Sequence, residues 1–91
     1  MNLEEFFSSK LRMKILKLFF QLGELNVSEV ARRLGINYKT TDRHLKILEK
    51  ERILKHKMYG RVCLYRLNKN SPKTKLIQEL LEVWEKTEKN L

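Results

Sequence analysis

Residues 26 to 54 read NVSEVARRLGINYKTTDRHLKILEKERIL, and this stretch predicts two short helices separated by a tight turn. Asn26 and Glu29 have the spacing of a capping box, in which each side chain accepts a hydrogen bond from a backbone amide at the start of a helix. The first helix is therefore expected to run from about residue 27 to 34. Gly35 follows it and can adopt the left-handed backbone conformation that ends a helix. Two helices joined in this way form a helix-turn-helix.

The second helix is expected to span about residues 38 to 51, with Asn37 as its cap. Its inward face comprises Thr41, His44, Leu45, Ile47 and Leu48. Its outer face carries four cations and one anion at spacings of three and four residues: Lys39, Asp42, Arg43, Lys46 and Lys50. The surface of a helix in a soluble protein normally mixes both signs, which pair with each other. This excess of cations suits phosphates and base edges, so nucleic acid is the expected partner.

The charge of the whole chain points to the same partner. There are 20 Lys and Arg against 11 Asp and Glu, a formal net charge of +9. Residues 10 to 67 hold 15 basic and 5 acidic side chains, so the charge belongs to the central segment. Between Arg52 and Gln78 there are eight basic residues and no acid. A field of one sign attracts polyanions, with a merely solvated surface as the alternative interpretation.

Length and composition exclude several classes of protein. Ninety-one residues are expected to form one small domain, 1–91, and domains of this size often gain stability from a partner subunit. Cys63 is the single cysteine, which excludes an intrachain disulfide and fits a reducing compartment. Charged residues interrupt the apolar N-terminal stretch, so we expect neither a signal peptide nor a membrane span, and a cytoplasmic location. The acids and histidines are scattered, so we do not expect an enzyme.

Ahead of the helix-turn-helix, a further helix is predicted from Ser8 or Ser9 to about Leu22, with Gly23 ending it. Its apolar positions form two stripes: Leu11, Ile15, Leu18, Phe19 and Leu22 on one face, and Met13, Leu16 and Phe20 on another. One domain core requires roughly a 100° stripe, so this helix is expected to make two separate contacts. More apolar surface lies just before it, at Leu3, Phe6 and Phe7.

After the helix-turn-helix the pattern changes from helical to extended. Residues 54–59 and 61–67 are rich in aromatic and branched side chains and flank Gly60, which predicts a two-stranded hairpin. Ser71 then caps a last helix, residues 72–90, which the only proline begins. Its apolar positions cover a wider arc than one small core requires: Leu76, Ile77, Leu80, Leu81, Val83 and Trp84.

The predicted order is helix, helix, helix, hairpin, helix. This is a mainly α fold with a small β-hairpin (α+β), known as the winged helix-turn-helix. Four segments match a known family: VARRLGI at 30–36, RHLKILE at 43–49, IL at 53–54 and YRL at 65–67. Through them the chain resembles the arsenic-repressor-like (ArsR-type) winged-helix transcription regulators of archaea and bacteria. The resemblance implies a DNA-binding core, 10–67, in which the hairpin, 54–67, is the wing.

The resemblance also implies that the helix 38–51 is a recognition helix that enters the major groove of double-stranded DNA. Its groove-entering residues would be Tyr38, Lys39, Thr40, Asp42 and Arg43, followed by Lys46 and Lys50. Arg43 is expected to contact either a guanine, through two hydrogen bonds, or a phosphate. Asp42 either orients Arg43 or Lys46, which we favour, or accepts from a cytosine amino group. Tyr38 either meets the sugar-phosphate backbone or packs on the preceding helix.

Cations outside the recognition helix extend the expected DNA-binding surface. Arg32 and Arg33, in the helix before the turn, either contact the DNA backbone or are ordinary solvated charges. The wing would lie along a neighbouring groove or phosphate run and supply Lys55, Lys57, Tyr59 and Arg61. Contacts to phosphate fix the register of a protein on DNA without reading the bases.

The surplus apolar surface of the first and last helices predicts a twofold homodimer. The dimerisation segments would be 1–22 and 72–90, with interface residues Leu3, Phe6, Phe7, Met13, Leu16, Phe20, Ile77, Leu80, Leu81 and Trp84. Such a dimer would place two recognition helices about 34 Å apart, which suits a pseudo-palindromic DNA site. The alternative is that these helices pack only on each other within one chain.

The chain departs from the metal-sensing members of the family. Those place cysteines in the recognition helix or near the chain ends, whereas Cys63 lies in the predicted second strand. Packing is its expected role, with redox sensing or an intersubunit disulfide as the alternatives. His44 lies on the inward stripe, where we expect a hydrogen-bonded structural histidine. Neither a metal nor a cofactor is expected.

The expected function is DNA-binding transcription regulation, by repression through occlusion, because no separate activation or ligand domain is predicted. Two alternatives stay open. A weakly sequence-selective architectural or chromatin-type protein would use the same cations without preferring one duplex over another. A winged helix can also serve as a protein-interaction module. The expected partners are double-stranded DNA and a second copy of the chain, with no membrane.

Overall fold

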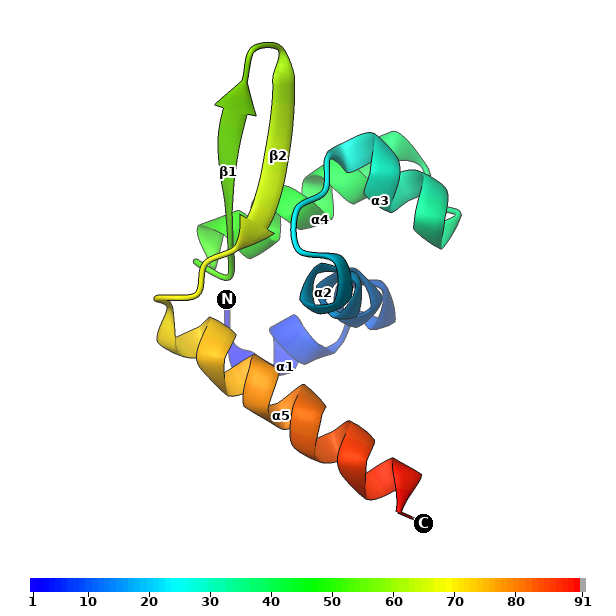
Figure 1. Ribbon diagram of the computed structural model, residues 1–91, viewed down its shortest axis with the longest axis vertical. Helices are drawn as coiled ribbons and strands as arrows, with labels where there is room; N and C mark the ends of the chain where they lie inside the picture. Colours follow the sequence, from blue (N-terminus) through cyan, green and yellow to red (C-terminus); the bar gives the residue numbers. More distant parts are fainter. Residues whose placement is uncertain (91) are drawn as a thin grey trace.

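The helices and strands follow the predicted order in the computed structural model, which describes residues 1–90 (Figure 1). They are α1 (Leu3–Phe7), α2 (Lys10–Leu22), α3 (Val27–Leu34), α4 (Tyr38–Lys50), β1 (Leu54–Tyr59), β2 (Val62–Leu67) and α5 (Pro72–Lys89). The short α1 is an addition, because the sequence predicted apolar surface but no separate helix at this position. The hairpin and the C-terminal end of α5 lie at opposite ends of the long axis (Figure 1).

The predicted caps form at the starts of three helices. The Ser9 hydroxyl accepts from the Arg12 amide at 3.1 Å ahead of α2. At α3 the capping box is complete, since the Glu29 amide donates to Asn26 Oδ1 at 2.8 Å and the Asn26 amide donates to Glu29 Oε1 at 3.1 Å. Asn37 caps α4 by accepting from the backbone amide three residues later, at 2.8 Å. The cap at Asn37 also fixes the end of the turn between α3 and α4.

The cap of the last helix differs from its prediction. Ser71 occupies the position before α5, but its side chain makes no capping hydrogen bond. Pro72 begins the helix as expected, because a first-turn residue has no intrahelical acceptor for an amide hydrogen. A buried hydroxyl fixes the start of α5 instead, since Thr74 Oγ1 donates to the Ile53 carbonyl at 3.3 Å.

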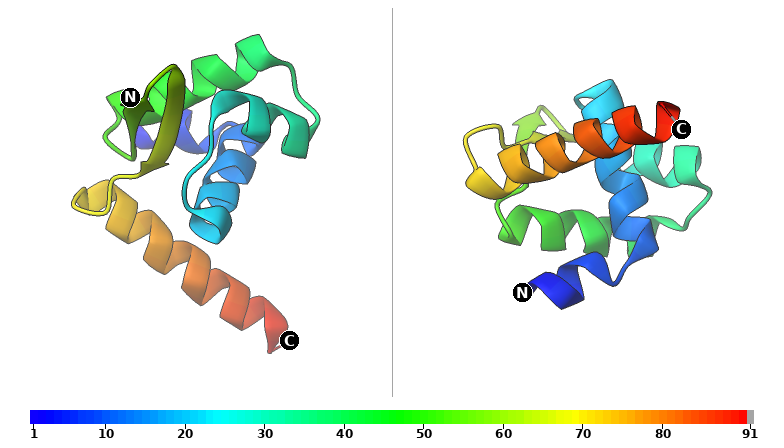
Figure 2. Two further views of the ribbon diagram at one scale, coloured as in Figure 1. Left: turned by 45° about the horizontal axis from the view of Figure 1, so that its top comes forward. Right: turned by 90° about the horizontal axis from the view of Figure 1, so that it is seen from below.

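The core gathers around α2, which lies at the centre of the molecule with α1, α3 and α5 around it (Figures 1 and 2). The completely buried apolar side chains of this core are Ile15, Leu16, Phe19, Val30, Leu45 and Leu48. Four of the five predicted inward residues of α4 are buried, and Ile47 is half-buried. The helix-turn-helix is thus packed against α2, which fixes the orientation of α4.

The central position of α2 overturns part of the predicted dimer surface. Leu16 has no exposed surface, and Phe6 and Ile77 are each only 6% exposed, because all three belong to the core of their own chain. Met13, Phe20 and Leu81 are half-buried and pack against the same core. Both apolar stripes of α2 are therefore used largely within the chain. The prediction that Leu16 forms part of a dimer interface is wrong, and Phe6 and Ile77 belong mainly to the core of their own chain.

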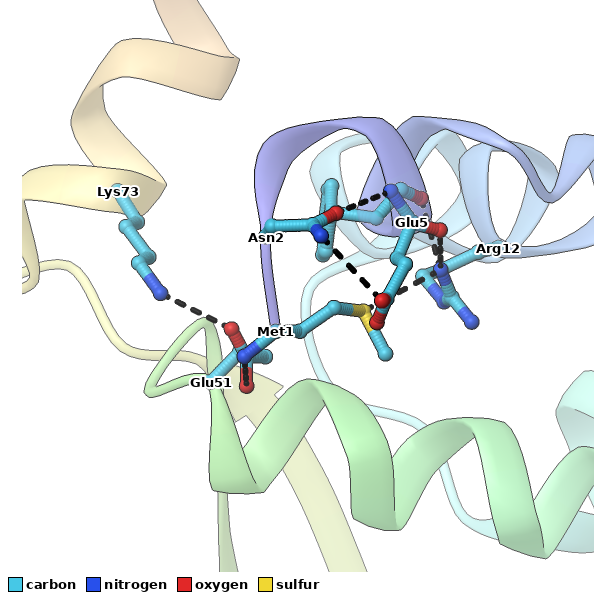
Figure 3. Close-up of polar contacts among 7 residues, drawn as sticks. Met1, Asn2, Glu5, Arg12, Glu51 and Lys73 are labelled. Carbon is cyan, nitrogen blue, oxygen red and sulfur yellow. Dashed lines mark hydrogen bonds and ion pairs between the residues drawn. The ribbon is translucent and has the colours of Figure 1, made fainter.

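Arg12 attaches the short α1 to α2. Its guanidinium donates to the Glu5 and Phe6 carbonyls at 2.9 and 2.7 Å, at the C-terminal end of α1 (Figure 3). The same guanidinium lies 5.6 Å from the centre of the Phe6 ring. Carbonyls at the end of a helix lack intrahelical partners, so a cation there stabilises the helix. Arg12 is buried as a result, a role that sequence analysis did not foresee.

The hairpin is joined to the helical body by a backbone bridge. Its register pairs Leu54 with Leu67 at the base and Tyr59 with Val62 at the tip. Gly60 has φ of 62°, which fits a two-residue turn of type II′, and Arg61 belongs to this turn rather than to β2 as predicted. At the other end of the hairpin, Leu25 and Tyr65 exchange backbone hydrogen bonds of 3.1 and 2.9 Å. This bridge ties the segment between α2 and α3 to β2.

The turn after α4 holds a non-glycine residue in the left-handed region. Arg52 has φ of 65° and is exposed. The turn is closed by the Ile53 amide, which donates to the Leu48 carbonyl at 2.9 Å. A side chain with a Cβ is disfavoured in this conformation, so the position is strained.

Replacing Arg52 with glycine is expected to raise the free energy of unfolding by about 1 kcal/mol, because glycine adopts positive φ without a Cβ clash. Urea denaturation would measure the change. Lys50→Gly, two residues earlier and within α4, is the matched control and should lower stability instead. A decrease for Arg52→Gly would contradict the assignment of strain to this turn.

Candidate nucleic-acid interface

The outward face of α4 is a continuous polar surface. It forms a broad hollow of about 640 Å³, lined by Asn37, Lys39, Thr40, Asp42, Arg43, Lys46, Ile47 and Lys50. The predicted groove-facing residues of this helix other than Tyr38 therefore lie together. The half-buried Ile47 adds an apolar side chain that the sequence had assigned to the inward face.

Asp42 is paired within the helix. Its carboxylate accepts from Lys46 Nζ at 2.8 Å, one turn further along α4. This hydrogen bond, together with the negative charge of Asp42, raises the pKa of Lys46. Of the two orienting roles considered for Asp42, the structure shows the one toward Lys46. Lys39, Arg43 and Lys50 make no ion pair with any residue in 1–90, so their charges face solvent.

The inner side of α4 holds its outer side in place. The Thr41 hydroxyl donates to the Asn37 carbonyl at 2.8 Å, and Leu45 and Leu48 are completely buried. His44 is buried too, but the predicted hydrogen bond is absent, since Nδ1 has no partner among residues 1–90. Burial lowers the pKa of His44, and the positive charges of Arg12 and Arg43 lower it further. The imidazole is thus held neutral and packs as a ring rather than as a hydrogen-bonded anchor.

Two further candidates adjoin the turn. Arg32 and Arg33 lie in the last turn of α3, and both are exposed. Tyr38, the first residue of α4, is 58% exposed. All three side chains are therefore accessible next to the start of α4.

The hairpin carries its predicted residues on one face and at its tip. Lys55, Lys57 and Tyr59 alternate along β1 and so share one face of the two-stranded sheet. Lys57 Nζ lies 5.3 Å from the centre of the Tyr59 ring, and Arg61 is exposed in the turn. Sequence analysis missed two apolar side chains near this tip. Met58 and Val62 are 54% and 47% exposed. The strand register pairs Val62 with Tyr59, on the face that carries Lys57, and places Met58 on the opposite face.

The opposite face of β1 contacts α4. The His56 amide donates to Glu49 Oε2 at 3.0 Å, and the His56 ring Nδ1 contacts the same oxygen. Glu49 is therefore occupied by the hairpin, which removes one acid from the free surface of the recognition helix. This contact also fixes the hairpin beside the C-terminal half of α4.

A reactive thiol, a metal site and a membrane-spanning helix are less well supported within residues 1–90. Cys63 is half-buried and packs against the core, which accords with the predicted packing role. Burial raises the pKa of its thiol, which favours the protonated, less reactive form. Residues 1–90 contain no group of three or more His, Cys, Asp or Glu side chains that could hold a metal ion. No helix among these residues has the length and apolarity needed to cross a membrane.

Comparison with known proteins agrees with this geometry. Solved structures with a similar fold include the transcriptional repressor PagR of Bacillus anthracis, which is 26% identical with a TM-score of 0.71 and coverage of 85% of each chain. The transcriptional repressor BigR of Xylella fastidiosa is 21% identical, with a TM-score of 0.76 and coverage of 92% of this chain and 81% of that one. The homodimeric winged helix-turn-helix DNA-binding domain Mb0332 of Mycobacterium bovis is 23% identical, with a TM-score of 0.73 and coverage of 90% and 73%.

These similarities confirm the predicted winged helix-turn-helix fold. No curated protein matched the sequence. A family model described as bacterial regulatory protein, arsR family, matches residues 9–56, which is just over half of the chain. That match covers α2, α3, α4 and the start of the hairpin. The chain therefore belongs to the ArsR family of bacterial regulatory proteins.

Proposed function

We propose that this protein represses transcription by binding double-stranded DNA with α4 in the major groove and the hairpin tip on the adjacent backbone or groove. The observation that carries the proposal is the outward face of α4. Lys39, Arg43 and Lys50 have no ion-pair partner in residues 1–90, while the inner side of the same helix is fixed in the core. The transcriptional repressors PagR and BigR share the fold, which supports this choice.

The proposed contacts differ in kind. Arg43 presents a guanidinium that can bond to a guanine edge through two hydrogen bonds, and so it would read sequence. Tyr38, Thr40 and Lys46 would position α4 on the DNA. The other two cations of the helix, Lys39 and Lys50, would do the same. Arg32 and Arg33 would contact the backbone beside the turn. At the hairpin tip the contacts would come from Lys57, Tyr59 and Arg61.

We also propose that the protein is a homodimer joined through α1 and α5. Leu76, Leu80, Val83 and Trp84 follow each other at spacings of one, three and four residues along α5, and each is between 44% and 67% exposed. Beside them lies a hollow of about 490 Å³ between α1 and α5, lined largely by apolar side chains that include Leu3, Phe7 and Leu80. An apolar strip of this length on one helix favours packing against a second copy.

The two surfaces give different parts of the chain different roles. Residues 10–67 would form the DNA-binding core, and α1 and α5 would hold two cores together. The recognition helices would then lie about 34 Å apart, one turn of DNA. A regulator acts where the DNA is, so we place the protein in the cytoplasm and assign it no catalytic activity. The cationic face of α4 disfavours a protein-interaction module.

The combined variant Lys39→Ala, Arg43→Ala is expected to bind its DNA site roughly tenfold more weakly or worse, because a bidentate base contact and a phosphate contact are lost. Lys86→Ala, near the C-terminal end of α5, is the matched control and should bind as the native protein does. A duplex selected from a random pool, titrated against random competitor by fluorescence anisotropy, would measure both. Equal affinity for selected and random duplexes would contradict a sequence-specific regulator and favour the architectural alternative.

The same titration tests the electrostatic contribution. With 6 to 10 phosphate contacts, affinity should fall roughly 10³- to 10⁵-fold between 50 and 200 mM salt. An affinity that barely changes over this range would contradict a phosphate-binding surface on α4 and the hairpin.

Asp42→Asn is expected to strengthen binding to random duplex DNA. The substitution removes a charge that repels phosphate and releases Lys46 from its 2.8 Å ion pair. The ratio between the affinities for selected and random duplexes should fall, because the added binding is independent of sequence. Weaker binding to every duplex would show that Asp42 supports DNA contact directly rather than through Lys46.

Leu80→Glu is expected to convert a micromolar dimer into a monomer, because it places a charge within the apolar strip of α5. Lys75→Glu changes an exposed position on the same helix outside the strip and should leave the dimer intact. Sedimentation velocity would measure both. A native protein that sediments as a monomer at micromolar concentration would overturn the proposed dimer.

A further inference from the structure

A second cluster of cations lies at the base of the hairpin, apart from the α4 face. It borders a hollow of about 390 Å³ whose charged lining residues are Glu24, Lys55, Arg66 and Lys69. Lys55 comes from β1, Arg66 from β2, Lys69 from the segment after β2, and Glu24 from the segment after α2. Four separate parts of the chain thus bring three positive charges and one negative charge to one place.

The strand register makes this arrangement electrostatically unfavourable. Lys55 and Arg66 are directly opposite each other across the antiparallel pair, so both side chains project from the same face of the hairpin. Like charges directly opposite in a sheet are destabilising. The one acid of the hollow compensates only weakly, since Glu24 Oε1 lies 3.8 Å from the nearest nitrogen of Arg66, beyond hydrogen-bonding distance. Lys55 and Lys69 make no ion pair with any residue in 1–90.

Arg66 also lacks the acceptors that its guanidinium needs. Its Nε atom is buried and has no hydrogen-bond partner among residues 1–90. A buried donor without an acceptor costs free energy, and native structures seldom leave one without a reason. The hollow therefore has an excess of positive charge, and one of its cations has a donor that is unpaired among the described residues.

The position of the hollow separates it from the proposed DNA-binding surface. Lys55 and Arg66 project from the same face of the hairpin as Lys57 and Tyr59, but they lie at the base of the hairpin rather than at its tip. Lys55 is also four residues from Tyr59, which places it roughly 13 Å from the hairpin tip. Sequence analysis placed Lys55 among the DNA contacts of the wing, whereas its place at the base of the hairpin puts it in this hollow.

We propose that this hollow binds the phosphate group of a small phosphorylated molecule. A phosphate supplies several acceptor oxygens and up to two negative charges, and a guanidinium matches its geometry through paired hydrogen bonds. Arg66 would donate through its guanidinium, and Lys55 and Lys69 would contribute charge from either side. Binding would relieve the repulsion between Lys55 and Arg66 and would draw Arg66 away from Glu24. The inference does not depend on DNA binding.

The test is a titration of the full chain with inorganic phosphate, without DNA and at constant ionic strength, followed by backbone amide NMR. Saturable shifts are expected at Glu24, Lys55, Arg66 and Lys69, and not along α4. Arg66→Gln should weaken phosphate binding about tenfold or more, because a charge-assisted donor is lost. Lys69→Ala should weaken it too, and this exposed loop position does not endanger folding.

Two further variants sharpen the test. Glu24→Gln should bind phosphate more tightly than the native protein, because the competing carboxylate is gone. Arg43→Ala, on the α4 face, should bind phosphate unchanged. If shifts are weak, unsaturable and spread over all surface cations, or if Glu24→Gln weakens binding, the proposal is wrong.

A last experiment distinguishes a small phosphorylated molecule from the DNA backbone as the source of the phosphate. Duplex DNA added to the phosphate-bound protein should leave phosphate in the hollow if the ligand is a small molecule. If DNA displaces it, and Arg66→Gln weakens DNA binding to the same extent, the hollow is a backbone contact and the proposed ligand class is overturned.

Discussion

The backbone bridge between Leu25 and Tyr65 is the constraint on which the geometry of this protein depends. A two-stranded hairpin is only marginally stable alone, so its direction must be set by what it touches. The bridge supplies two hydrogen bonds between the end of the α2–α3 connection and β2. Both residues are buried, and burial raises the pKa of Tyr65 to about 12, so its hydroxyl remains protonated. The hairpin is thereby attached to the same segment that leads into the helix-turn-helix.

Much of the fold could be predicted because its signals are local. The capping box at Asn26 and Glu29, the glycine after α3 and the proline at the start of α5 each act within a few residues, so sequence alone located these ends. Leu16 shows where such reasoning stops. Its periodicity correctly indicated an apolar face, but periodicity does not say whether that face is covered by the same chain or by another. The answer depended on α2 lying at the centre of the molecule.

The residues of the candidate site likewise divide into those that the sequence reveals and those that only the fold reveals. The cations of α4 could be found from their spacing, because the helix alone determines which residues share a face. Arg66 could not, since its significance depends on standing opposite Lys55, and that pairing follows from the register of the hairpin. Arg12 was missed for a related reason. From sequence alone an arginine is expected at the surface. Only the fold shows that the Arg12 guanidinium donates to the carbonyls at the end of α1.

The two acids at the end of α4 explain how its outer face stays cationic and how it is joined to α5. Glu49 is occupied by His56 of β1, and Glu51 accepts from Lys73 Nζ of α5 at 3.0 Å (Figure 3). The hydrogen bond from Lys73 lowers the pKa of Glu51, so the pair stays ionised. An exposed ion pair contributes little stability by itself, but Ile53 and Thr74 are buried directly beside it and share a hydrogen bond. The end of the recognition helix is therefore fixed to the start of α5. In a dimer joined through α5, this junction would set the distance between the two recognition helices, so the operator spacing would depend on α5 as much as on α4.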